Sequence, residues 1–125
     1  MSDGFIVALI TTYNRPELLK IQALNSVKSQ SLQPNQVVLV DNSDEKTILE
    51  TNKQNFQELF PNGIYLKNGG FPSAAGTRNF GLKYINENYP DSWTAILDDD
   101  DEWLENHLQN NSPYMTDYDV VLGGI

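Results

Sequence analysis

Short, mostly apolar runs alternate along this chain with segments in which apolar residues recur every three or four positions. The runs lie at residues 5–10, 37–40, 64–66, 93–97 and 120–122. Continuous apolar runs are typical of strands buried on both faces, as in a parallel sheet covered by helices. The alternation therefore predicts an α/β fold, a Rossmann-like α/β/α sandwich around a mainly parallel sheet.

The segment after the first run carries the signals of a helix start. Asn14 is expected to cap the helix, with Glu17 three residues later as its capping-box partner and Pro16 in the first turn. Apolar residues then follow at helical spacing, namely Leu18, Ile21, Leu24 and Val27.

Further helices are expected between the later runs. The second has an apolar side that we expect to be buried, formed by Ile48, Phe56, Leu59 and Phe60. The third opens at Pro72 or Ser73 and ends near Asn88. A short helix through Trp103 and Leu108 precedes the last run.

The order of the strands decides which polar residues meet. Right-handed crossovers restrict the possible topologies. In the order 3-2-1-4 the first and fourth strands lie side by side, and ligands bind outside their carboxyl ends, where the strand order reverses. Residues 11–13 and 98–101 would reach that crevice, and Asp41 would lie on the neighbouring strand.

The acidic run at residues 98–101 is the most informative segment. A helix cap uses one or two carboxylates and contributes about 0.5–2 kcal/mol. Carboxylates roughly 4 Å apart repel by about 1 kcal/mol in water and about 4 kcal/mol at an effective dielectric of roughly 20. A divalent cation removes that repulsion, and hard oxygen ligands suit Mg²⁺, Mn²⁺ or Ca²⁺. The run therefore favours a cation site over capping, and with it a phosphorylated ligand such as a nucleotide diphosphate.

Four other side chains near the crevice each allow two interpretations. Asp41 could accept hydrogen bonds from a ribose hydroxyl or a base N–H, or form an Asx turn with Ser43. Tyr13 could stack on a base or simply lie at the rim. Arg15 and Arg78 could each pair with phosphate or form a surface ion pair.

Composition narrows the choice of function. The chain has 125 residues, which fits one domain or part of a larger one, and a formal net charge of −9, which argues against a broad nucleic-acid-binding face. It has no Cys, so disulfides, thiolate zinc sites and cysteine nucleophiles are excluded. The single histidine, His107, is expected on the surface of the last helix rather than at a catalytic centre.

The apolar runs and the N-terminus bear on location, and glycine-rich motifs bear on nucleotide binding. The apolar runs are too short for a membrane span, and the N-terminus lacks a basic signal region, so we expect a cytoplasmic protein without a transmembrane segment. The chain has no G-x-x-x-x-G-K-[ST] segment and no G-x-G-x-x-G after the first run.

Taken together, these segments resemble the nucleotide-sugar-binding half of family 2 glycosyltransferases of GT-A fold. The resemblance rests on the order of four segments: the first run with Thr-Thr-Tyr-Asn-Arg-Pro, then Val-Val-Leu-Val-Asp-Asn-Ser, then Gly-Thr-Arg-Asn at residues 76–79, and finally Leu97 with the aspartates up to Trp103. It covers nearly the whole chain and implies a single donor-binding domain over residues 1–125.

The resemblance implies specific roles for these residues. Thr11 and Tyr13 would line the base pocket, with Tyr13 stacked on the base, and Asp41 would hydrogen-bond the base, typically uracil. Arg78 would reach the base or the phosphates of the donor. Arg15 is also expected in the donor site, on the ground of its charge alone and not of the resemblance. In the acidic run, Asp98 or Asp99 would contact ribose, and Asp100 would bind the Mn²⁺ or Mg²⁺ ion that bridges the diphosphate of a UDP-sugar.

Length is where this chain departs from the family, whose members are about twice this size or more. We expect the acceptor half to be absent from this chain. No residue matches the general base that an inverting transfer needs, so we expect little turnover from this chain alone. The last strand would then leave an edge that invites a homodimer or strand exchange. The alternatives are a non-catalytic metal- or nucleotide-binding module and, more weakly, an aspartate-based phosphotransferase.

Overall fold

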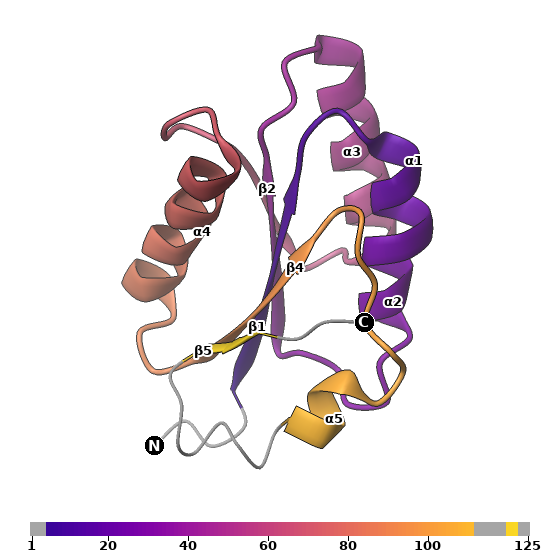
Figure 1. The fold of residues 1–125 in the computed structure, drawn as a ribbon, viewed down its shortest axis with the longest axis vertical. Helices are drawn as coiled ribbons and strands as arrows, with labels where there is room; N and C mark the ends of the chain where they lie inside the picture. Colours follow the sequence, from indigo (N-terminus) through magenta and orange to yellow (C-terminus); the bar gives the residue numbers. More distant parts are fainter. Residues whose placement is uncertain (1–4, 112–119, 123–125) are drawn as a thin grey trace.

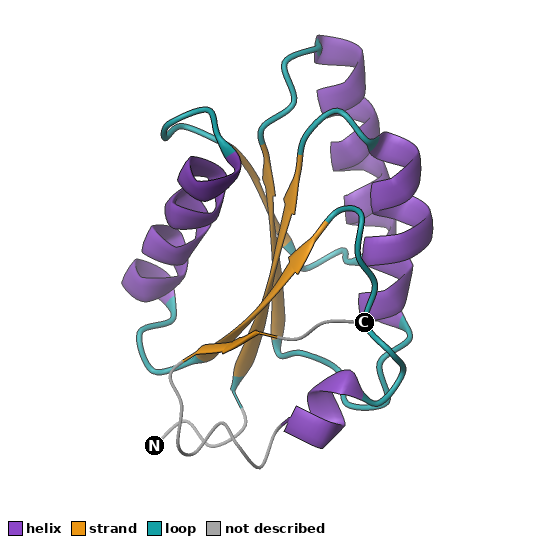
Figure 2. Ribbon diagram, in the orientation of Figure 1, coloured by secondary structure: helices purple, strands orange, loops and turns teal. Residues whose placement is uncertain are grey.

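The computed structural model describes residues 5–111 and 120–122. Its strands form one sheet in the order β3-β2-β1-β4-β5, with every neighbouring pair parallel (Figure 2). They are β1 (Ile6–Thr12), β2 (Gln36–Asp41), β3 (Ile64–Lys67), β4 (Trp93–Asp98) and β5 (Val120–Leu122). The predicted α/β fold is confirmed, and the first four strands have the order 3-2-1-4 that was considered above.

The central strand β1 positions the site. All of its residues are buried, because β2 and β4 flank it and helices cover both faces of the sheet. The register places Thr12 opposite Asp41 on β2 and Thr11 opposite Asp98 on β4. Polar residues from three neighbouring strands therefore meet at the carboxyl edge of the sheet.

Helices cover the two faces of the sheet unequally. One long helix, α4, lies alone on one face, and the remaining longer helical segments lie on the other (Figure 1). The helical segments are α1 (Pro16–Leu18), the π-helix η1 (Leu19–Leu24), α2 (Asn25–Lys28), α3 (Lys46–Leu59), α4 (Ala74–Asn88) and the short α5 (His107–Asn111).

Alternating residues of β1 serve the two halves of the core. Ala8 and Ile10 belong to the cluster on the α1–α3 side, and Val7 and Leu9 belong to the cluster on the α4 side. Gly81 lets α4 approach the sheet closely, since a Cβ atom there would lie 2.5 Å from a methyl carbon of Leu9.

The start of the first helix differs from the prediction. Asn14 is not the cap: it adopts a left-handed φ of 50°, and Arg15 takes the N-cap position, with Pro16 following. Leu18 and Ile21 are exposed, at 39% and 66%. The wide π turn, bonded i to i+5, changes which positions face the core. The buried apolar positions on this segment are Leu19, Ala23, Leu24 and Val27.

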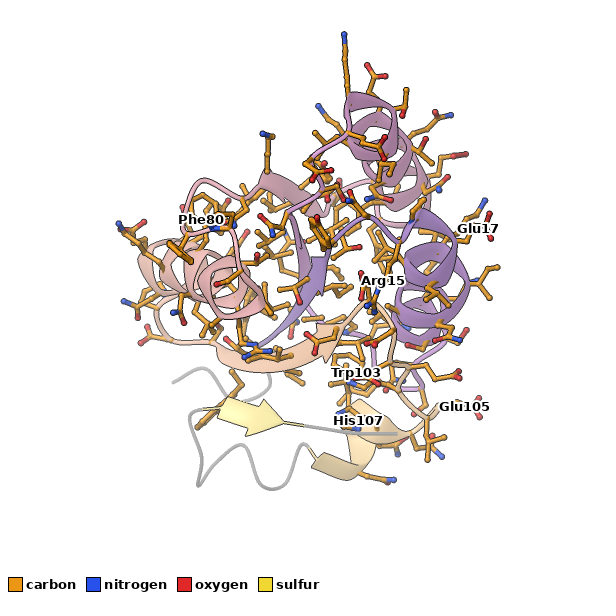
Figure 3. All side chains as sticks on the ribbon, turned by 45° about the horizontal axis from the view of Figure 1, so that its top comes forward. Arg15, Glu17, Phe80, Trp103, Glu105 and His107 are labelled. Atoms are coloured by element: carbon orange, nitrogen blue, oxygen red, sulfur yellow. The ribbon has the colours of Figure 1, made fainter. Side chains whose placement is uncertain are left out.

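Of the predictions for the later helices, the cap of α4 is confirmed, whereas the start of the last helix and the exposure of His107 are wrong. Ser73 caps α4 by accepting a 2.9 Å hydrogen bond from the N–H of Gly76, as expected. In the described part of the chain the last helix, α5, begins only at His107, so Trp103 lies in the loop before it. His107 is not a surface residue, since it is 9% exposed and its ring stacks on Trp103 at a centroid distance of 4.8 Å. Figure 3 shows these two rings side by side.

Candidate functional site: a polar pocket at the carboxyl edge of the sheet

A pocket of about 520 Å³ opens where the strand order reverses. Its wall comes from the ends of β1 and β4, the loop after β2 and the first turn of α4. The lining residues are Thr11, Thr12, Tyr13, Arg15, Asn42, Asp44, Pro72, Ser73, Ala74, Thr77, Asp98, Asp99 and Asp100. The predicted residues Thr11, Tyr13, Arg15 and Asp98 to Asp100 are therefore brought together in one wall.

Asp99 points inward and braces the pocket. It is 6% exposed and accepts hydrogen bonds from the Thr12 hydroxyl at 2.8 Å and the Tyr13 N–H at 3.0 Å. Burial raises the pKa of Asp99, while these two hydrogen bonds and the nearby Arg15 oppose the rise. The carboxylate therefore ties the loop after β4 to the loop after β1.

The other three aspartates form a carboxylate cluster. One oxygen from each of Asp98, Asp100 and Asp101 lies within 4.8 Å of the others. Burial, followed by the charges of Asp100 and Asp98, raises the pKa of Asp101. Three convergent carboxylate oxygens form a hard donor set of the kind that Mg²⁺ and Mn²⁺ prefer, so these residues fit the divalent cation predicted from the sequence.

Helix capping does not explain the acidic run. Among the described residues, the next helix begins at His107, six positions after Asp101. The N–H of Trp103 donates to Ser26 at 3.0 Å, which anchors the far end of the loop on α2. The aspartates therefore lie on a short loop that is fixed at both ends.

Two arginines flank this cluster. Arg15 lies 3.0 Å from Asp100 and 3.5 Å from Asp99, and Figure 3 shows it between the sheet and the first helix. Arg78, on α4, lies 3.7 Å from Asp98 but is not among the described residues that line the pocket. Both side chains are 38–49% exposed, so either can reorient toward an anionic ligand.

Asp41 takes a different position from the one expected. It is fully buried and accepts hydrogen bonds from the Tyr65 hydroxyl at 2.7 Å, the Asn52 amide at 3.0 Å and the Ser43 N–H at 3.0 Å. Burial together with Asp41 raises the pKa of Tyr65. The structure does not bring Asp41 into the described pocket wall, and the Ser43 bond is the Asx turn left open above.

Asn42 and Asp44 stand in the wall instead, and sequence reasoning missed both of them. Their position in the sequence could have indicated this, because they directly follow a buried strand that ends at the carboxyl edge of the sheet. Asp44 accepts hydrogen bonds from the Tyr13 hydroxyl at 3.3 Å and the Asn14 amide at 3.0 Å. Tyr13 is 50% exposed, so its ring remains open to a ligand.

The first turn of α4 was also missed as part of the wall. The loop before it is held by Asn68, whose amide donates to Asn42 at 3.0 Å, to the Phe71 carbonyl at 3.1 Å and to Thr77 at 3.2 Å. Gly76 is required beneath this loop, since a Cβ atom there would collide with the backbone of Phe71. The loop that carries this part of the pocket wall is therefore held by side-chain hydrogen bonds to the loop after β2 and to α4.

These features define a Rossmann-like α/β domain with a ligand pocket at its switch point. The family model described as glycosyl transferase family 2 matches residues 7–125, and the chain therefore belongs to this family. None of the curated proteins compared with the chain matches it. Within the described residues, no helix is long and apolar enough to cross a membrane.

Two solved structures share the fold, which is of GT-A type. The crystal structure of S. aureus TarS matches with a TM-score of 0.60 and 22% identity, covering 89% of this chain and 19% of that chain. The structure of S. aureus TarS 1-349 in complex with UDP matches with a TM-score of 0.58 and 21% identity, covering 89% of this chain and 32% of that chain. The matched part of this chain thus spans less than a third of either structure.

Proposed function

We propose that residues 1–125 form the donor-binding domain of a glycosyltransferase that uses a nucleoside diphosphate sugar and a divalent cation. The observation that carries the proposal is the carboxylate cluster of Asp98, Asp100 and Asp101, of which Asp98 and Asp100 line the pocket. Membership in glycosyl transferase family 2 supports sugar transfer as the reaction class. The solved complex of TarS with UDP supports a uridine nucleotide as the donor's leaving group.

Charge explains why a cation is needed. Four carboxylates and one guanidinium group line the pocket, so its wall is negative overall. A diphosphate would be repelled from such a wall unless a cation lay between them. Asp100 is the proposed ligand, with Asp98 and Asp101 close enough to share the ion. A bound Mn²⁺ or Mg²⁺ supplies Lewis-acid stabilisation of the departing nucleoside diphosphate.

The protein's own side chains would position the donor. Tyr13 offers its exposed ring to the base, beside Thr11. Arg15 and Arg78 lie next to the aspartates and would turn toward phosphate oxygens. Asp98 is the better placed of the two candidates for ribose, because Asp99 is buried and already bonded to Thr12 and Tyr13. A base contact by Asp41 would require it to leave its present partners.

Titration calorimetry with UDP, with and without Mn²⁺, tests the donor site. We expect Mn²⁺ to strengthen UDP binding and Asp100→Asn to abolish that gain. Asp91→Asn is the matched control, because Asp91 lies before the amino end of β4, at the opposite edge of the sheet. A UDP affinity that is unchanged both by Mn²⁺ and by Asp100→Asn would refute the cation bridge. Binding without sugar transfer by the whole protein would favour the alternative, a non-catalytic nucleotide-binding module.

The cytoplasmic location, the homodimer and the low turnover of this chain alone stay predictions.

A further inference from the structure

The loop after β4 has little regular structure of its own. Residues 99–106 contain turns but no helix or strand. After the acidic run the chain passes beside α2 before it reaches α5 (Figure 1). Main-chain N–H and C=O groups in such a segment need partners elsewhere, so the shape of the loop depends on the side chains that lie next to it.

The buried amide of Gln30, just after α2, bonds this loop on two sides. Its Nε2 donates to the Leu104 carbonyl at 2.7 Å, and its Oε1 accepts from the Leu108 N–H at 2.9 Å. Nε2 also donates to the Ser26 carbonyl at 3.1 Å, which fixes the amide against its own helix. Gln30 is 4% exposed, so water has little access to these bonds.

Ser26, one helical turn earlier, holds the same loop nearer to the aspartates. Its hydroxyl accepts from the Trp103 N–H at 3.0 Å and donates to the Ala23 carbonyl at 2.9 Å. The Trp103 side chain is buried in the same core cluster as Ala23. Ser26 and Gln30 therefore hold the loop at the second and third residues after Asp101.

This anchoring opposes the repulsion within the carboxylate cluster. One oxygen from each of its three aspartates lies within 4.8 Å of the others, and without a cation these charges repel. Asp98 is fixed at the end of β4, so the repulsion is relieved most easily by movement of Asp100 and Asp101 on the loop. Anchors directly after Asp101 limit that movement and keep the carboxylates near the arrangement that a cation needs.

We propose that Ser26 and Gln30 are positioning residues for the cation site: they hold the loop after β4 so that its carboxylates converge before the ion binds. This inference rests on the proposed function, because it takes the carboxylate cluster to bind a divalent cation. Neither residue is among the described residues that line the pocket. Their effect on the ion therefore passes through the main chain of the loop.

Calorimetry of Mn²⁺ binding to this chain separates positioning from general stability. Gln30→Met keeps the side-chain length and removes the amide. We expect its Mn²⁺ affinity to be roughly fivefold weaker, because the loop must then become ordered when the ion binds. Ser26→Ala removes the anchor closest to the aspartates and should weaken binding by a similar factor. A loss of global stability alone leaves the affinity unchanged while nearly every molecule is folded, and thermal unfolding of each variant establishes that condition.

Gln33→Met is the matched control for Gln30→Met. The Gln33 amide donates to three main-chain carbonyls at the end of α2, and these described bonds do not reach the loop after β4. Ile85→Val is the control for stability, because it removes a buried methylene from the core under α4, on the opposite face of the sheet. Both variants should bind Mn²⁺ as the unmodified chain does.

Amide hydrogen exchange gives a second readout that uses no metal. The Asp101 N–H donates to the Asp98 carbonyl at 3.1 Å and so reports on the turn within the acidic run. In metal-free Gln30→Met this N–H should exchange several-fold faster than in the unmodified chain, whereas the N–H groups of β1 keep their rates. A side chain that only contributed to global stability would not produce that local difference.

An Mn²⁺ affinity that is unchanged in either Gln30→Met or Ser26→Ala would overturn the inference, and so would equal losses in the two control variants. Failure of the proposed function looks different. The unmodified chain would then bind neither Mn²⁺ nor UDP in the presence of Mn²⁺, and both proposals would fall together.

Discussion

The hydroxyl of Thr12, at the end of β1, donates a 2.8 Å hydrogen bond to the buried carboxylate of Asp99, which lies 87 positions later in the sequence. This bond joins the central strand to the loop that carries the carboxylate cluster. One member of the acidic run therefore works as an internal brace, and its neighbours are left to face the pocket.

Replacing Thr12 by Val should weaken both stability and cation binding. The substitution keeps the side-chain volume but removes a donor from a buried carboxylate, which costs roughly 1–3 kcal/mol of unfolding free energy. Urea unfolding measures the first effect and Mn²⁺ calorimetry the second. Thr51→Val is the control, because the Thr51 hydroxyl bonds a backbone carbonyl on the exposed side of α3. Equal effects of the two substitutions would contradict the brace.

Replacing Arg15 by Gln should change cation and nucleotide binding in opposite directions. Without nucleotide, Arg15 lies 3.0 Å from Asp100 and competes with a cation for that carboxylate. We therefore expect Mn²⁺ to bind a few-fold more tightly to the variant, because an exposed ion pair is worth roughly 1 kcal/mol or less. UDP should bind more weakly in the presence of Mn²⁺, because a phosphate partner is lost.

Lys20→Gln removes the same charge from an exposed helical position and serves as the control for Arg15. Both affinities should stay unchanged in that variant. A fall in both Mn²⁺ and UDP affinity for Arg15→Gln would show that the arginine supports the loop rather than competing with the cation.

His107 should make stability depend on pH. Burial lowers the pKa of His107 below its usual value of 6.5. The unfolded chain then binds a proton more readily than the folded one, so the free energy of unfolding falls as the pH drops through about 6.5. The contribution of the neutral His107 to the free energy of unfolding is fully present above pH 6.5. It is lost as the pH falls toward the lower pKa of the folded state. In urea unfolding, the free energy of unfolding should therefore fall less between pH 8 and pH 5 in His107→Gln than in the unmodified chain.

All other ionisable groups are the same in the two proteins, so the difference between their pH profiles isolates His107. Identical pH profiles for the two proteins would mean that the histidine does not contribute.

Tyr65→Phe tests the structural role of Asp41. The variant removes the 2.7 Å hydrogen bond to this fully buried carboxylate, and we expect the unfolding free energy to fall by roughly 1–3 kcal/mol. UDP affinity should change less than twofold, because Asp41 does not reach the described pocket wall. Tyr84→Phe, on α4, is the control for loss of a phenolic hydroxyl. A large loss of UDP affinity at unchanged stability would restore Asp41 to the base site.

Sequence patterns predicted the architecture because the sheet obeys strong rules. Unbroken apolar runs can be satisfied only by strands covered on both faces, and chain connectivity then fixes their order. The same rules placed Thr11 beside Asp98, which the register confirms. Tyr13 and the aspartates were found in this way, before any side chain was placed.

The errors lie where side-chain direction is set by tertiary contacts. Nothing in four consecutive aspartates distinguishes Asp99 from its neighbours, because a loop after a strand has no fixed period. Asn14 looked like a helix cap, but its amide is used by Asp44 on another loop. His107 looked polar and exposed, but the Trp103 ring covers it. In each case the decisive partner is distant in sequence or lies in a loop.

Tyr13 is fastened at two points, by its backbone N–H to Asp99 and by its phenolic hydroxyl to Asp44. These two hydrogen bonds restrict rotation of the ring before a ligand binds. A planar ligand group that stacks on the ring therefore costs little further side-chain entropy. Affinity at this position would then reflect stacking alone. Removing either hydrogen bond should therefore weaken binding, because the ring would then lose its rotational freedom only when the ligand binds.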